Sequence, residues 1–157
     1  MTEIVQGTDE WKALRLGRVT ASRVADVMAK TKSGFSASRD AYMAQLICER
    51  LTGQVAESFK NAAMIHGTET EPLARAAYET FKNVLVDEVA FIEHPTIPMS
   101  GASPDGLIGD DGLVEIKSPQ TNTHIEVLLS KKVPGKYITQ MQWQMACTGR
   151  KWCDFVS

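Results

Sequence analysis

The chain has 157 residues, of which 43% are hydrophobic and 23% charged, and its formal net charge is −2 at pH 7. This balance is typical of a globular domain with a sizeable core, and it excludes intrinsic disorder as the main state. The sequence has no secretory signal, no apolar run long enough to cross a membrane and no CxxC pair among its three cysteines, so we expect a reducing, cytoplasmic compartment and no membrane association.

The first half of the chain is predicted to be mainly helical. Four helices are expected, over residues 8–15, 20–29, 37–52 and 61–82. Thr8 or Asp9 would cap the first helix and Thr20 the second, because side-chain oxygens accept hydrogen bonds from the free amides at a helix start. Gly53 suits the end of the third helix, and residues 31–35 are expected to form a loop.

The second half is predicted to alternate strands and helices. A β-rich stretch begins at residue 84, strands follow at 97–102, 107–108, 113–117 and 152–156, and helices at 121–131 and 137–148. This order predicts an α/β layer fold with a central mixed sheet flanked by helices. We expect residues 1–157 to form a single domain and, because the chain stops directly after a predicted strand, to lack a C-terminal segment.

Charge is distributed unevenly along the chain. Residues 1–60 carry nine bases and seven acids, residues 61–117 carry three bases and ten acids, and residues 118–157 carry five bases and two acids. An acidic middle between basic flanks fits a cation site beside a polyanion site, although solvated surfaces also scatter charge in this way. Any nucleic acid would therefore bind in a local basic groove rather than through a global positive field.

The most informative segment places Asp105 in an SPDG turn ahead of a strand with the pattern apolar-Glu-apolar-Lys. Alternation along that strand puts Glu115 and Lys117 on one face and directs Val114 and Ile116 into the core. A tight turn between the strands would bring Asp105 close to Glu115. Paired carboxylates suit Mg²⁺ or Mn²⁺, and the lysine could orient a water aimed at a phosphodiester. The competing interpretation is a surface hairpin with an ordinary Glu–Lys pair.

Four sequence blocks resemble the phage lambda exonuclease family of viral recombination nucleases, within the PD-(D/E)xK superfamily. The blocks are WKALRLG with TAS (11–17 and 20–22), GTETE (67–71), SPDG with EIK (103–106 and 115–117) and YITQMQW (137–143). They occur in the family's order over nearly the whole chain. The resemblance implies that the mixed sheet and its helices form a restriction-endonuclease-like nuclease domain.

The resemblance also implies a function. It predicts a Mg²⁺-dependent 5′→3′ exonuclease that digests one strand of linear double-stranded DNA from 5′-phosphorylated ends. The 3′ overhangs would serve phage-type recombination by single-strand annealing, with a homotrimeric ring, a single-strand annealing protein as partner and the bacterial host cytoplasm as location. Two alternatives stay open: an endonuclease or other-polarity nuclease of the same superfamily, and a non-catalytic DNA-end-binding module.

Residue by residue, the resemblance assigns a metal site on the predicted hairpin. Asp105 and Glu115 would bind two Mg²⁺ ions, which Mn²⁺ could replace, and the backbone carbonyl of Ile116 would be a further ligand. Lys117 would position the attacking water. The metals would stabilise the negative charge of the transition state and assist the leaving 3′ oxygen.

Glu71 matches the family's helical carboxylate near the metals. The pattern Thr68-x-x-Glu71 also fits a helix capping box, which is the competing interpretation. Glu71 lies off the helical face of Leu73 and Ala77 that is predicted to be buried, whereas Glu69 lies near that face and is the competing acid. The resemblance favours Glu71.

Gln140 lies on the same predicted helical face as Tyr137 and Gln144. Its neutral amide could bond a phosphate oxygen or a water without adding charge, although polar helix faces are often simply exposed to solvent. By resemblance Gln140 is assigned to the catalytic site and Tyr137 to substrate binding. Gln142 and Gln144 stay unassigned.

Arg15 matches the arginine that captures the terminal 5′-phosphate in this family, and Ser22 matches a hydroxyl of the same pocket. A guanidinium binds phosphate as a bidentate fork, although an exposed arginine after a helix is the commonest state of this residue. Arg18 and Arg23 are expected to extend the basic surface around the pocket.

Overall fold

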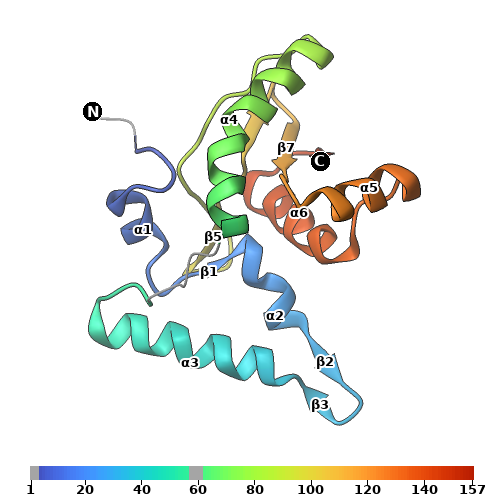
Figure 1. The fold of residues 1–157 in the computed structure, drawn as a ribbon. Helices are drawn as coiled ribbons and strands as arrows, with labels where there is room; N and C mark the ends of the chain where they lie inside the picture. Colours follow the sequence, from blue (N-terminus) through green and yellow to red (C-terminus); the bar gives the residue numbers. More distant parts are fainter. Residues whose placement is uncertain (1–3, 57–61) are drawn as a thin grey trace.

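Short mixed sheets and helices alternate along the chain, and the computed structural model describes them over residues 4–56 and 62–157 (Figure 1). The elements, in chain order, are α1 (Asp9–Arg15), β1 (Val19–Thr20), the 3₁₀ turn η1 (Ala21–Arg23), α2 (Val24–Met28), β2 (Lys30–Thr31), β3 (Gly34–Phe35), α3 (Ala37–Thr52), α4 (Ala62–Lys82), β4 (Ile92–Glu93), β5 (Ser100–Ala102), β6 (Gly106–Ile108), β7 (Gly112–Ile116), α5 (Thr121–Ser130), α6 (Gly135–Thr148) and β8 (Trp152–Val156). The predicted start of the fourth helix, residue 61, lies outside the described residues.

Two three-stranded sheets form the centre of the described structure. The first has the order β1-β5-β4, with β1 parallel and β4 antiparallel to β5. The second has the order β6-β7-β8, with β6 antiparallel and β8 parallel to β7. Both sheets are mixed and carry helices, so the predicted α/β class is confirmed, with the strands divided between two short sheets.

The second sheet lies between α4 and α6, and its central strand β7 is therefore buried along its whole length. Val114 and Ile116 pack with Tyr78 of α4 in one core cluster. The opposite face of β7 turns Glu115 toward α6, whose amide side chains contact it. The alternation predicted for this strand is therefore confirmed: one face presents Glu115 to α6, and the other packs Val114 and Ile116 into the core.

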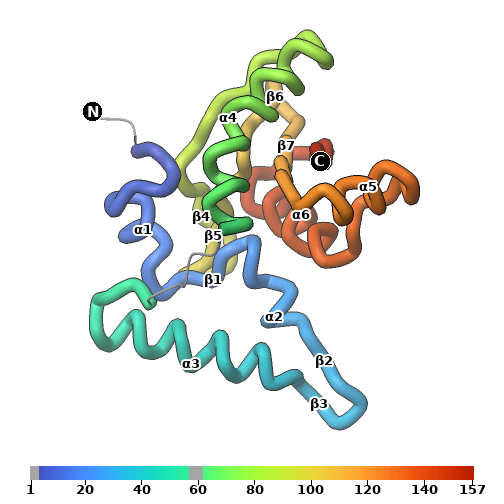
Figure 2. Tube along the Cα trace, viewed as in Figure 1, coloured from blue at the N-terminus to red at the C-terminus, as the bar shows by residue number. Residues whose placement is uncertain are grey.

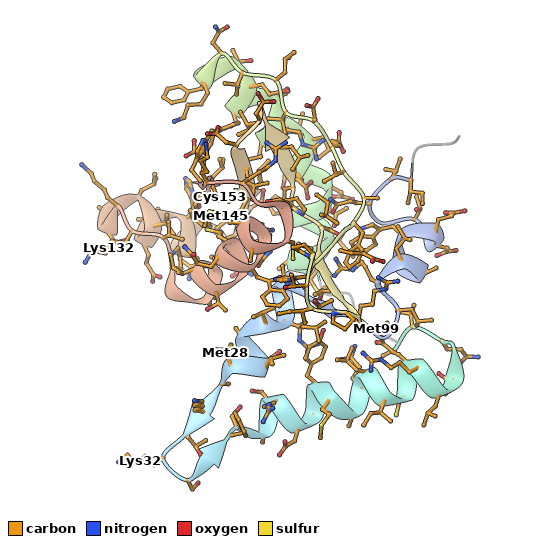
Figure 3. The ribbon with its side chains drawn as sticks, turned by 180° about the vertical axis from the view of Figure 1, so that it is seen from behind. Met28, Lys32, Met99, Lys132, Met145 and Cys153 are labelled. Atoms are coloured by element: carbon orange, nitrogen blue, oxygen red, sulfur yellow. The ribbon has the colours of Figure 1, made fainter. Side chains whose placement is uncertain are left out.

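A second body of structure extends away from these sheets. Helix α3 and the β2–β3 hairpin project from the centre, as the chain trace in Figure 2 shows. Lys32 lies at the tip of this hairpin, and Lys132 lies in the loop after α5 (Figure 3). Residues 31–35, predicted as a loop, thus belong to a short antiparallel hairpin in which Lys30 pairs with Phe35.

Several predicted helix boundaries are confirmed and one is wrong. Thr8 caps α1 by accepting a hydrogen bond from the Trp11 amide, and Gly53 ends α3 in a left-handed conformation with φ of 66°. Thr20 makes no side-chain cap; it belongs to β1 and pairs with Gly101. Because that pairing keeps the backbone extended through Thr20, a 3₁₀ turn and the short α2 replace the single helix predicted over 20–29.

The buried face of α4 differs from the predicted one. Leu73 is 72% and Phe81 85% exposed, whereas Tyr78 is 7% exposed and its hydroxyl donates to Asp154. Alanine and aromatic residues lie on more than one side of this helix, so periodicity alone did not select the face that packs. The competing interpretation, in which Thr68 and Glu71 form a capping box, is wrong because Thr68 lies inside the helix.

The last features of the fold concern the length and hydrophobicity of the helices and the state of the cysteines. Within residues 4–56 and 62–157, no helix is both long and apolar enough to span a bilayer. All three cysteines, Cys48, Cys147 and Cys153, are free.

Candidate active site

The β6–β7 hairpin brings the two predicted acids together. Its register pairs Gly106 with Val114, which places Asp105 opposite Glu115 across the hairpin. The backbone amide of Ile116 donates to Oδ2 of Asp105 at 2.7 Å and fixes that carboxylate at the strand end. The hairpin is closely packed, since a Cβ on Gly106 would lie 2.0 Å from Cγ1 of Val86.

Lys117 lies on the same face of the strand as Glu115 and contacts both acids. Its ammonium forms an ion pair with Oε1 of Glu115 and lies 4.0 Å from Oδ2 of Asp105. The structure thus gathers the three side chains that the sequence motif predicts, two carboxylates with one amine between them.

The carboxylate of Glu115 has no solvent exposure and is held by two amide side chains of α6. Nε2 of Gln140 donates to Oε1 at 2.6 Å, and Nε2 of Gln144 donates to Oε2 at 2.6 Å. The two glutamines are four residues apart, so they lie one turn apart on the same helix face. Gln140 is therefore at the site, as predicted, together with a second amide that stayed unassigned.

The charges of the cluster perturb one another. Burial, followed by the carboxylates of Glu115 and Glu71, raises the pKa of Asp105 to about 7, while the Lys117 ammonium and the hydrogen bond from the Ile116 amide act in the opposite direction. Burial lowers the pKa of Lys117, but Glu115 and Asp105 outweigh it, so that pKa lies above its ordinary value. The lysine is thus held as a cation between two acids, one of which ionises only near neutral pH.

The donor set fits a hard divalent cation that keeps part of its water. No group of three or more His, Cys, Asp or Glu side chains in the described ranges has a metal-binding arrangement. Mg²⁺, however, usually retains several waters and takes only one or two protein carboxylates. Asp105 and Glu115 supply two, and their mutual repulsion, seen in the raised pKa of Asp105, is what a cation would relieve.

A cleft of about 690 Å³ opens beside this cluster. Residues of α4, including Glu69 and Glu71, form one wall, and Ile116, Lys117 and Tyr137 line the rest. The ring of Tyr137 stacks on Phe155 with centroids 5.5 Å apart, and Nζ of Lys117 lies 5.5 Å from the Tyr137 centroid. The cleft therefore lies between the acid cluster and an aromatic surface that includes Tyr137, the residue assigned by resemblance to substrate binding.

Glu71, rather than Glu69, interacts electrostatically with the hairpin. Both acids line the cleft, but Glu71 is the one that raises the pKa of Asp105. Arg75 holds Glu71, with Nη2 of the arginine 2.8 Å from Oε1, and also pairs with Glu88. The placement of Glu71 agrees with the family resemblance and not with a capping role.

Arg15 reaches the acid hairpin through Ser103. Its Nη1 donates to Oγ of Ser103 at 3.1 Å, and its guanidinium lies 4.2 Å from the Trp11 ring centroid. Ser103 precedes Asp105 by two residues, so the basic group lies at the edge of the acid cluster. Ser22 is exposed, and its hydroxyl contacts that of Thr20 at 3.5 Å, whereas the hydrogen bond of Arg15 is made to Ser103.

Helix α3 fixes the backbone that follows Arg15. The amide of Gly17 donates to Oε2 of Glu49 at 2.8 Å, and its carbonyl accepts from Nε of Arg50 at 2.7 Å. Gly17 has φ of 63°, and a Cβ there would lie 2.6 Å from Cγ of Arg50. The turn after α1 is thus held by α3 through both the amide and the carbonyl group of Gly17.

Arg18 and Arg23, predicted to extend the basic surface, each pair with a carboxylate. Arg18 forms an ion pair with Glu93, and Nε of Arg23 lies 2.6 Å from Asp26. Part of their charge is therefore compensated within the chain.

The prediction missed three residues that contact the site. Gln144 could have been found from its spacing of four residues after Gln140. Ser103 and Arg75 contact Arg15 and Glu71 respectively, and only the tertiary fold makes those contacts visible.

Comparison with known proteins gives consistent matches. The model of the family described as YqaJ-like viral recombinase domain matches residues 10–151. The crystal structure of LHK-Exo, an alkaline exonuclease from Laribacter hongkongensis, is 60% identical with a TM-score of 0.87 and covers 94% of this chain and 72% of that one. The structure of LHK-Exo in complex with dAMP gives the same values.

A more distant structure shares the fold. A phage-related exonuclease from Haemophilus somnus 129PT is 13% identical with a TM-score of 0.64, covering 88% of this chain and 67% of that one, and at this identity the likeness shows the fold alone. No curated protein sequence matches the chain.

Proposed function

The chain belongs to the YqaJ-like viral recombinase family, and from this premise we propose that it is a Mg²⁺-dependent 5′→3′ exonuclease acting on one strand of linear duplex DNA. Membership confirms the resemblance to viral recombination nucleases predicted from the sequence. The coarser class, an exonuclease of this family, follows from the family match and from the similar alkaline exonuclease. The finer assignments of polarity, metal and substrate end belong to the proposal.

The observation that carries the proposal is the convergence of Asp105, Glu115 and Lys117 at the edge of one cleft. In the proposed site, Asp105 and Glu115 hold Mg²⁺ together with the carbonyl of Ile116, and Glu71 adds a further carboxylate across the cleft. When bound, Mg²⁺ would supply a Lewis acid that stabilises negative charge on the phosphodiester in the transition state.

The remaining groups of the cleft orient the reactants. Lys117 donates a hydrogen bond that holds the attacking water against the phosphorus, and the amide of Gln140 orients the water or a phosphate oxygen without adding charge. Tyr137 packs against the sugar and base of the nucleotide that is removed. These roles use side chains that lie on the cleft wall or contact the buried acid.

Arg15 and Ser22 serve in the proposal as the 5′-phosphate site. A guanidinium offers a planar pair of donors that matches a terminal phosphate, and the hydroxyl of Ser22 adds a third donor. The Ser103 contact of Arg15 supports this role, because it places the phosphate-binding group next to the acid hairpin. Removal of one nucleotide at a time from a 5′ end requires the phosphate-binding group and the metal-binding acids to lie close together.

The proposal extends to assembly. We infer from the family that the chain works as a homotrimeric ring around DNA and hands its 3′ overhang to a single-strand annealing protein. A net charge of −2 is compatible with such a ring only if the basic side chains face the channel.

Digestion of end-labelled duplexes tests the proposal. Linear DNA with 5′-phosphate or 5′-hydroxyl ends, labelled at either terminus, is incubated with the protein and with Mg²⁺, Mn²⁺ or EDTA. We expect mononucleotides to be released from the 5′ end, faster from 5′-phosphorylated DNA, and only when a metal is present.

Other products would contradict it in distinct ways. Release from the 3′ end would overturn the polarity, and cutting of covalently closed circles would indicate an endonuclease. Tight binding of 5′-phosphorylated ends without any metal-dependent product would indicate a non-catalytic end-binding module.

A further inference from the structure

Gln144 is a fully buried polar side chain in direct contact with the acid cluster. It has no solvent exposure, and neither has Glu115, the acid that it contacts. A buried carboxylate stays ionised only if hydrogen-bond donors replace the water that it has lost. The donors around Glu115 therefore decide its orientation.

The two oxygens of Glu115 are held by different kinds of group. Oε1 is contacted by Lys117, which lines the cleft, and by Gln140, which is half-buried. Within the described residues, Oε2 accepts a hydrogen bond from Gln144 alone, at 2.6 Å. Oε1 can thus exchange partners when a cation or substrate arrives, whereas Oε2 is anchored inside the protein.

An amide suits an anchor of this kind. It donates a hydrogen bond without carrying charge, so it fixes the carboxylate and leaves its negative charge available to a cation. The other end of the same amide has no partner: Oε1 of Gln144 is buried and accepts no hydrogen bond. The side chain therefore makes one hydrogen bond, to Glu115, and gives up the other, which indicates that the contact with Glu115 determines its placement.

We propose that Gln144 is the positioning residue for Glu115, which it holds through Oε2 so that Oε1 faces Asp105 and the cleft for a divalent cation. This inference rests on the proposed metal-dependent function, and it adds a residue that touches neither substrate nor metal. Gln140 and Gln144 then have different roles: Gln140 contacts Oε1, the oxygen that Lys117 also contacts, and Gln144 holds Oε2 inside the protein.

Replacement of Gln144 by methionine tests the role. Gln144→Met keeps the length of the side chain, removes the donor and removes the unpartnered oxygen, so the core remains filled. We expect the affinity for Mn²⁺, measured by isothermal titration without DNA, to fall about 10- to 100-fold. We expect kcat for duplex digestion in Mg²⁺ to fall by a similar factor, with KM for DNA ends changed less than about 2-fold, because Arg15 lies outside this contact.

Two further variants separate positioning from packing. Gln142→Met changes an exposed glutamine of the same helix and should leave both measurements as in the wild type. Gln144→Asn keeps the amide but shortens it by one methylene, so it should lose metal affinity as Gln144→Met does. Circular dichroism and the unfolding midpoint show that each variant is folded.

The outcomes are distinguishable. A folded Gln144→Met with wild-type Mn²⁺ affinity, or one that changes only KM, overturns the inference. If Gln144→Met does not fold, Gln144→Asn decides in the same way. Failure of the wild type to digest duplex DNA would instead overturn the proposed function, and the Mn²⁺ titration would still decide the role of Gln144.

Discussion

The β6–β7 hairpin carries the buried acids, and the α1–β1 segment carries Arg15, which contacts the chain next to that hairpin. The two regions hold their charged side chains by different kinds of contact. In the hairpin, the side chain of Glu115 has no solvent exposure and is held by two amide side chains of α6. In the N-terminal segment, Arg15 is half-buried and is placed through the backbone of Gly17, which α3 holds on both sides.

Under the proposed function, this difference predicts that hydrolysis and recognition of the DNA end are separable. The acid cluster depends on a buried network, so removal of one member should affect the chemistry most strongly. Arg15 depends on a separate anchor and meets the hairpin only at Ser103. Variants of the two regions should therefore change different kinetic quantities.

The largest expected effect comes from the hairpin. Asp105→Ala should reduce Mg²⁺-dependent digestion at least about 10³-fold, because a carboxylate that holds the cation supplies several kcal/mol of transition-state stabilisation. Binding of 5′-phosphorylated ends in EDTA should stay within about 2-fold, measured by fluorescence anisotropy. Asp110→Ala, in the exposed turn of the same hairpin, is the matched control. Retained digestion by Asp105→Ala would reject the site.

A smaller effect is expected from the N-terminal segment. Arg15→Ala should lower the preference for 5′-phosphate over 5′-hydroxyl ends by about 10- to 100-fold, since a charged hydrogen bond contributes about 1.5–3 kcal/mol. The rate on 5′-hydroxyl ends should hardly change. Lys12→Ala, on the same helix, serves as the control, and competition between the two substrates gives the measurement. An equal loss on both ends would mean that the two regions are not separable.

The last prediction concerns stability and pH rather than activity. The pKa of Asp105 is raised to about 7, so the folded state binds this proton more tightly than the unfolded state, whose aspartate titrates near 3.9. The stabilisation is complete below about pH 4 and is lost as the pH rises through 7, by at most about 1.4 kcal/mol per pH unit.

Thermal unfolding in EDTA between pH 4 and 8 measures this dependence. Asp105→Asn should flatten it, whereas Arg15→Ala should leave the slope unchanged. A wild-type protein that gains stability over the same interval because of Asp105 would contradict the assignment.

The hairpin was predictable because its determinants are local. Alternation places Glu115 and Lys117 on one face, and a turn of Gly and Asp fixes the register that brings Asp105 opposite. A glycine accepts the left-handed conformation that often ends a helix, so Gly53 marked the end of α3 correctly, and Gly149 ends α6 in the same way.

The errors arose where distant segments decide the outcome. The pairing of β1 with β5 overrides the helix predicted from Thr20, and the contact with Asp154 selects Tyr78 as the buried residue of α4. The helical spacing puts Gln144 on the same face as Gln140, but only the fold shows that it contacts Glu115. Local patterns therefore predicted the ligand-bearing strand well and its supporting contacts poorly.

The parallel pairing of β7 with β8 has a consequence for synthesis on the ribosome. Residues Gly112 to Ile116 pair in register with Trp152 to Val156, and the crossover between them contains α6 with both glutamines. A nascent polypeptide that has just exposed its acids still lacks the strand and the amides that orient them. Glu115 therefore acquires its full set of contacts only after β8 has emerged from the ribosome.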